Sequence, residues 1–175
     1  MNTTLFFPFV LGRIIAIMTT AFVLFLSGGE YAKAQVAVPS AKTATQTEYK
    51  SLERALQNPD KVYRLNLSGM MMTELPADIA KLKNLQYLDL SFNQLDSLPK
   101  ELCTLNNLET LNVLFNQITR LPDEFSTLKK LRNLNIANNK ISEVPIVLTQ
   151  LTGLQNLDIA GNSLQAGMIQ GMLAH

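Results

Sequence analysis

The chain has 175 residues, enough for one domain with a short appendage. Its 15 basic and 14 acidic residues nearly cancel, and no concentrated basic face is evident, which excludes the usual signature of a nucleic-acid binder. The single cysteine, Cys103, excludes a disulfide framework and a paired-cysteine metal site, and the only histidine, His175, argues against histidine chemistry. We therefore expect no metal and no cofactor.

The first 34 residues have the form of a signal peptide. Arg13 precedes an apolar run over 14–26, and the small residues of Ala32-Lys33-Ala34 suit a signal-peptidase site between Ala34 and Gln35. Export to the periplasm or the medium is the prediction. The alternative is an anchor retained over residues 5–26, because 22 residues suffice to span a bilayer of roughly 30 Å.

Two short segments separate the predicted signal peptide from the rest of the chain. Residues 35–47 are rich in Ala, Thr, Ser and Gln and have few large apolar groups, which predicts a flexible stem. Over 48–60, Tyr49, Leu52 and Leu56 follow a helical spacing and Pro59 is a stop signal, which predicts an N-terminal cap helix.

From residue 61 to residue 164 the chain repeats itself every 23 residues. Five units begin at Val62, Leu85, Leu108, Leu131 and Leu154. The fourth position is always leucine: Leu65, Leu88, Leu111, Leu134 and Leu157. The ninth position is asparagine in four of the units: Asn93, Asn116, Asn139 and Asn162. A Leu-Pro or Val-Pro step follows in each of the first four units, at 75–76, 98–99, 121–122 and 144–145.

The pattern L-x-x-L-x-L-x-x-N-x-L over residues 62–164 resembles the leucine-rich repeat family in its 23-residue form. The resemblance implies an α/β solenoid, a right-handed coil with short parallel strands on a concave face, helical or irregular convex arcs, and helical end caps. It implies a binding scaffold, and the family name alone specifies no partner.

Each part of the repeat has a physical reason. Alternation around Leu88 and Leu90 points two side chains inward from a short strand. The recurring asparagines can satisfy the backbone of their own turn and of the neighbouring one, which predicts a structural ladder. The pattern lapses after Leu164, where the apolar residues of 165–175 predict a weak C-terminal cap helix.

Outward positions of the strands are candidates for partner contact. The fifth position is always Asn or Asp. This constancy indicates either a solvent-exposed feature common to all repeats or a polar stripe that a partner contacts. The two carboxylates in this column are too far apart to form a cation site. Tyr87, Leu114 and Phe115 are the best anchors, and Phe92 shares the eighth position with Phe115, where packing and contact are equally plausible. The predicted contact residues are Arg64, Asn66, Tyr87, Asp89, Thr110, Asn112, Leu114, Phe115, Asn133, Asn135, Asn156 and Asp158.

A catalytic role has little support in the sequence. Cys103 shares its column with Ala80, Ser126 and Thr149, which favours a confined and inert thiol over a reactive one. No nucleophile and base recur together, so we predict that the protein is not an enzyme.

The prediction is an exported module that binds another protein or a cell-envelope ligand through its concave face. One alternative is an envelope-anchored structural or adhesive protein. Another, which requires that the N-terminus is not a signal peptide, is an intracellular regulator of a signalling enzyme or small GTPase. The oligomeric state is left open.

Overall fold

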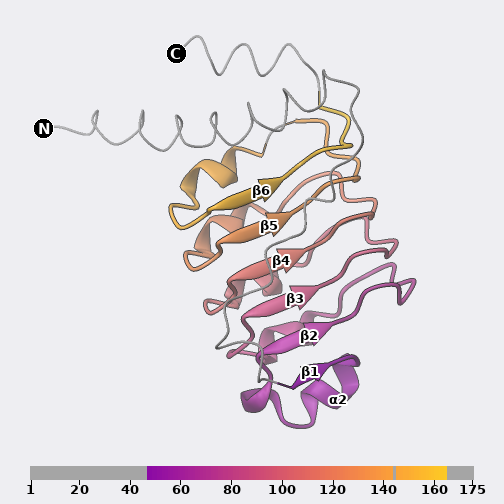
Figure 1. Cartoon of the computed structure of the whole chain (residues 1–175), viewed down its shortest axis with the longest axis vertical. Helices are drawn as coiled ribbons and strands as arrows, with labels where there is room; N and C mark the ends of the chain where they lie inside the picture. Colours follow the sequence, from indigo (N-terminus) through magenta and orange to yellow (C-terminus); the bar gives the residue numbers. More distant parts are fainter. Residues whose placement is uncertain (1–46, 144, 165–175) are drawn as a thin grey trace, which may run out of the picture.

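A computed structural model describes residues 47–143 and 145–164. Its sheet has six parallel strands in the order β1 to β6, so each strand pairs with its neighbours in sequence. Figure 1 shows them stacked along the long axis of the molecule. The strands span Glu48–Tyr49 (β1), Arg64–Asn66 (β2), Tyr87–Asp89 (β3), Thr110–Asn112 (β4), Asn133–Asn135 (β5) and Asn156–Asp158 (β6).

Between successive strands from β2 onwards, each coil returns through a five-residue 3-10 helix. These helices span Ala77–Lys81 (η2), Lys100–Thr104 (η3), Asp123–Thr127 (η4) and Ile146–Gln150 (η5). A proline precedes each one, and its fixed φ near −60° keeps the strand from extending and leads the chain into the return. A 3-10 turn covers the convex side in few residues, so the convex arcs are helical, as predicted.

The repeat places like residues beside like residues. Leu65, Leu88, Leu111, Leu134 and Leu157 are paired in exact register across β2 to β6. Each is buried in one continuous aliphatic core. The predicted solenoid is therefore confirmed, because adjacent coils bury these leucines against one another.

The ninth-position asparagines, which we call the asparagine ladder (Asn93, Asn116, Asn139 and Asn162), join consecutive coils. Asn116 Nδ2 donates to the carbonyl of Leu90 in the preceding coil (2.9 Å) and to that of Val113 in its own (3.0 Å). Its Oδ1 accepts from the backbone N–H of Leu95 in the preceding coil (3.0 Å). Asn93, Asn139 and Asn162 repeat this pattern.

The N-terminal end differs from the predicted cap helix over 48–60. The α-helix α2 covers only Leu52–Leu56, and a 3-10 turn, η1, covers Pro59–Lys61. Ser51 has an extended backbone, and its Oγ accepts from the N–H of Arg54 (3.4 Å), which starts the helix there. Before it, Glu48 and Tyr49 pair with β2 as an additional strand. The predicted helix is too long because its first residues complete the sheet.

Other predicted segments lie outside the described residues. These are the signal peptide over 1–34 with its cleavage site at Ala34 and Gln35, nearly all of the stem over 35–47, and the C-terminal cap helix over 165–175. Among the residues that the structure does describe, no helix is long and apolar enough to cross a membrane.

Candidate functional site

The sheet has an open face, on the side away from the core, formed by the third, fifth and seventh positions of each unit. The third-position column is Arg64, Tyr87, Thr110, Asn133 and Asn156, and the fifth is Asn66, Asp89, Asn112, Asn135 and Asp158. The fourth-position leucines between them point into the core. The register thus brings all ten of these predicted contact residues into two parallel rows.

The fifth-position column has a structural task in every unit. Its side-chain oxygen accepts a hydrogen bond from the backbone N–H two residues later. Asp89 Oδ1 accepts from Ser91 N (2.8 Å), for example, and Asn112 Oδ1 accepts from Leu114 N (3.2 Å). The same bond is made by Asn66, Asn135 and Asp158. This Asx-turn ends each strand, so the constant Asn or Asp follows from local backbone chemistry. The first polar atom of each of these side chains is therefore occupied, and Asp89 Oδ2 and Asn112 Nδ2 are also hydrogen-bonded to each other.

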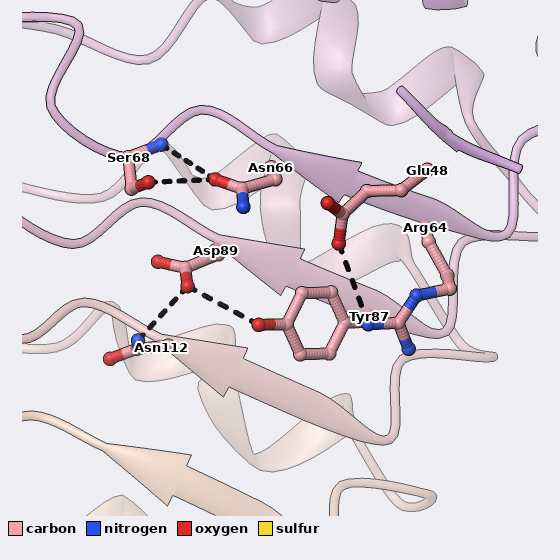
Figure 2. Close-up of polar contacts among 7 residues, drawn as sticks. All are labelled: Glu48, Arg64, Asn66, Ser68, Tyr87, Asp89 and Asn112. Carbon is pink, nitrogen blue, oxygen red and sulfur yellow. Dashed lines mark hydrogen bonds and ion pairs between the residues drawn. The ribbon is translucent and has the colours of Figure 1, made fainter. Parts of the chain in front are cut away.

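The open face over β2 to β4 carries a chain of side-chain contacts, which we call the polar chain (Figure 2). Arg64 pairs with Glu48 of β1 (Nη2 to Oε1, 3.5 Å), and its guanidinium lies 4.0 Å from the centre of the Tyr87 ring. The Tyr87 hydroxyl donates to Asp89 Oδ2 (3.2 Å), and Asn112 Nδ2 donates to the same oxygen (3.2 Å). Four strands are therefore connected by partners that hold one another in place.

The Tyr87 phenol stays neutral over the physiological range. Burial, together with the charge of Asp89 and the hydrogen bond to it, raises the pKa of Tyr87 to about 12, which outweighs the opposing effect of Arg64. The neutral hydroxyl remains a donor to Asp89.

The other half of the open face is uncharged along its third-position column. Asn133 Nδ2 donates to Thr110 Oγ1 (3.1 Å), and Asn156 Nδ2 donates to Asn133 Oδ1 (2.7 Å). Thr110 and Asn135 are only 1% and 5% exposed. Their side chains offer almost no surface to a partner, so these two are the weakest of the predicted contact residues.

The eighth position of every unit adopts left-handed backbone. The φ values are 69° at Gly69, 56° at Phe92, 53° at Phe115, 52° at Asn138 and 67° at Gly161. Glycine and asparagine tolerate this conformation, whereas a phenylalanine pays about 1–2 kcal/mol for it. The two rings nevertheless stack with centroids 5.0 Å apart and planes at 24°. Both remain exposed, at 57% for Phe92 and 47% for Phe115.

The environment of Cys103 makes its thiol unreactive. The side chain is buried in η3, and burial, with smaller effects from Glu124 and Glu101, raises the pKa of Cys103 to about 12. The residue instead contributes structure, since its carbonyl accepts from the Thr127 hydroxyl of the next coil (2.6 Å).

A shallow hollow lies on the loops that precede β5 and β6. It has a volume of about 290 Å³, and its lining combines the charged Lys129, Lys130, Arg132 and Glu109 with the uncharged residues 152–155. Lys129 and Lys130 already donate to Gln150 O (3.2 Å) and Asn107 Oδ1 (2.7 Å), so these two cations are engaged by neighbouring coils. Within 47–143 and 145–164, no group of three acidic, cysteine or histidine side chains is placed to hold a metal.

Two features of the structure were missed by sequence reasoning. The helix predicted over 48–60 includes Glu48, whereas the structure places Glu48 in β1, where it pairs with Arg64. A second amide ladder joins the return loops: Asn84 Nδ2 donates to Asp60 O (2.8 Å), and Asn107 Nδ2 donates to Lys83 O (2.9 Å). Their 23-residue separation is a signal that could have revealed this ladder.

Comparison with known proteins agrees with this geometry. A family model described as a leucine-rich repeat region matches residues 61–173, well over half of the chain. The chain belongs to the leucine-rich repeat family. No curated protein sequence matches it.

Three solved structures are similar to this leucine-rich repeat chain. InlP of Listeria monocytogenes is 35% identical over 58% of this chain and 28% of that one, with a TM-score of 0.52. The BIR2 ectodomain of Arabidopsis thaliana is 26% identical over 65% and 62%, with a TM-score of 0.50. A leucine-rich repeat protein of Leptospira interrogans is 28% identical over 69% and 48%, with a TM-score of 0.38. The chain thus spans less than two thirds of each of these proteins.

Proposed function

We propose that this leucine-rich repeat domain is an exported module that binds another protein through the open face of its sheet. The observation that carries the proposal is the polar chain, which runs from Glu48 through Arg64, Tyr87 and Asp89 to Asn112. A partner would meet side chains that are already ordered, and pre-ordering lowers the entropy cost of association. Tyr and Arg are also the residues most enriched among strong contacts at protein interfaces.

The structural neighbours support a binding role in general terms. InlP and the BIR2 ectodomain share the fold, and the latter is by its name the extracellular portion of its protein. Burial raises the pKa of Cys103 to about 12, which supports a structural role for this residue. The protein partner is proposed over a cell-envelope ligand because the polar chain is built from residues typical of protein interfaces.

The test of the open face is affinity capture with residues 35–175 as bait. The Tyr87→Ala/Asn112→Ala variant removes two members of the polar chain, and we expect it to retain about tenfold less of any specific partner. Lys81→Ala, on the convex helix η2, is the control and should capture as the wild type does. Melting curves by circular dichroism establish that each bait is folded. Equal capture by wild type and double variant would refute the open-face assignment.

Export is part of the same proposal and has its own test. It is supported by the apolar run and the Ala32-Lys33-Ala34 step, which predict cleavage before Gln35. N-terminal sequencing of the natural protein should therefore begin at Gln35. A chain that starts at Met1 and fractionates with membranes would instead support an anchor over residues 5–26.

A further inference from the structure

Phe92 and Phe115 occupy positions that the fold does not require to be aromatic. Units with Gly69, Asn138 or Gly161 at the eighth position make the same left-handed turn. Those residues adopt it at low cost, whereas a phenylalanine is disfavoured there. Two adjacent coils therefore carry a large side chain where a small one would form the loop more easily.

Contacts within the molecule offset only part of the conformational cost of the left-handed backbone at Phe92 and Phe115. Their mutual stacking covers one side of each ring, and about half of each side chain remains in water. Next to them, the loop after β2 exposes Met70 at 48% and Met71 at 75%. All of these loops leave the carboxyl ends of adjacent strands, at one edge of the sheet (Figure 1). We call Met70, Met71, Phe92 and Phe115 the loop-edge patch.

We propose that the loop-edge patch is a second docking surface, which binds an apolar, aromatic-bearing segment of the same protein partner that the open face engages. The inference rests on the proposed function and adds the chemistry of a second contact. Folding alone gives no reason to keep an exposed aromatic pair at a disfavoured backbone conformation. A binding surface does give such a reason, because aromatic side chains contribute strongly to binding. Methionines beside the rings add a polarizable surface that adapts to a partner's side chains.

Surface area favours one partner that covers both surfaces at once. With about half of each side chain exposed, the loop-edge patch offers on the order of 400 Å² of apolar surface. The open face offers roughly another 400 Å², from five strands spaced ~4.8 Å apart. A standard interface needs about 800 Å² on each side, so neither surface suffices alone and the two together do.

The two surfaces are continuous, and the residues that flank each ring in its own coil are uncharged. Phe115 directly follows Leu114, a half-buried residue at the end of the open face. Two residues beyond each ring are Gln94 and Gln117, both exposed neutral amides, and the equivalent Lys140 of the next coil donates to Gln117 Oε1 (2.9 Å). A membrane-binding surface would place lysines or arginines beside the rings themselves. An apolar protein segment bordered by polar groups fits this arrangement better.

The experiment uses the full chain and a displayed library of random linear peptides as the probe. Phe92→Asn/Phe115→Asn gives both positions the residue that unit four already has at Asn138. Ile146→Asn is the control, because Ile146 is an apolar residue on the convex helix η5 that is more exposed than either phenylalanine. Enriched peptides are synthesised and titrated calorimetrically against each variant.

The expected result is that peptides enriched on the wild type carry aromatic or large aliphatic residues. They should bind the double variant about tenfold more weakly or worse, and bind Ile146→Asn as they bind the wild type. The double variant should melt at or above the wild-type temperature, since asparagine suits the left-handed turn. Peptide binding that survives Tyr87→Ala/Asn112→Ala would show that the patch acts even if the open-face assignment fails.

Several results would overturn the inference. They are the absence of any enriched peptide, equal binding to the double variant, or a lower melting temperature with unchanged binding, which would make the rings structural. Wild-type dimers that dissociate in the double variant would assign the patch to a second copy. Binding to neutral or anionic phospholipid vesicles that requires the two rings would assign it to a membrane.

Discussion

Cys103 shows how a single side chain in this fold is governed by its position in the column. The equivalent residues Ala80, Ser126 and Thr149 are all small, because the column lies on the 3-10 return where adjacent coils meet. The thiol is buried there, and its ionisation is opposed by burial first and by Glu124 and Glu101 next. Its chemistry is thus suppressed by packing.

The raised pKa of Cys103 predicts a loss of stability at alkaline pH. The pKa is about 12 in the folded chain against an ordinary 9. Between these values the unfolded thiol releases its proton and the folded one keeps it, so the free energy of unfolding falls as pH rises, by up to about 1.4 kcal/mol per pH unit. Below pH 9 the thiol is protonated in both states, so the stability associated with Cys103 is fully present. Tyr87 adds a similar effect above pH 10.

Urea unfolding between pH 9 and 11 tests the contribution of Cys103. Cys103→Ala, which Ala80 shows the column accepts, should lose stability less steeply with pH than the wild type. Parallel curves for the two proteins would contradict the assignment.

At the scale of the elements, the strands are too short to associate by pairing alone. β2 to β6 have three residues each, and the asparagine ladder adds bonds between coils at the point where pairing stops. Every ladder member serves its own coil and the preceding one. A coil's loop is therefore completed by the residue of the next coil.

Removal of one ladder member should be costly. Asn116→Ala leaves the buried N–H of Leu95 without its partner and removes one of the two amide donors to each of the carbonyls of Leu90 and Val113, which keep Asn93 and Asn139. Because an unsatisfied buried group costs about 1–3 kcal/mol and each lost hydrogen bond about 0.5–1.5 kcal/mol, we expect a loss of about 2–4 kcal/mol in the free energy of unfolding. Urea denaturation measures it, with the exposed Asn106→Ala as control. Similar losses for the two variants would mean that water replaces the amide.

The elements also show which features are predictable from sequence. The 23-residue spacing of Leu65, Leu88 and Leu111 translates directly into strand register, because the core repeats with the same period. β1 has only two residues, too few for an alternating pattern, and Tyr49 happens to share a helical spacing with Leu52 and Leu56. Strand formation there depends on pairing with β2, which no local pattern encodes.

The open face was harder to predict than the core, because its contacts depend on side-chain conformations and on neighbours across strands. The two rows of contact candidates follow from periodicity alone. The Arg64–Tyr87 stacking and the Asx-turns of Asp89 and Asn112 do not, because they require the final backbone geometry. The left-handed φ of Phe92 is likewise hidden by its residue type, although Gly69 in the same column signals it.

At the scale of the whole molecule, the stabilising contacts lie between neighbouring coils and do not converge on one central core. Leu111 on β4 has a paired leucine on both sides, whereas Leu157 lies on β6, the last strand of the described sheet. In a linear array each coil is stabilised by its interfaces, so a coil with two interfaces contributes more than a terminal one.

Leucine substitutions should therefore follow position along the array. We expect Leu111→Ala to lower the free energy of unfolding by about 3–5 kcal/mol and Leu157→Ala by about 2 kcal/mol. Hydrogen exchange should show Leu157→Ala loosening β6 selectively, while Leu111→Ala weakens protection throughout the sheet. Equal effects from the two substitutions would contradict a nearest-neighbour description.

The exact register from β2 to β6 has a consequence for how this gene can change. Any crossover between two copies that joins the same phase of the 23-residue period yields a chain in which every junction is already known to fit. A crossover between copies offset by one repeat adds or removes one strand and alters the length of the solenoid by ~4.8 Å. Unequal recombination would thus change the area of the open face in fixed steps, while the packing of the core stays the same.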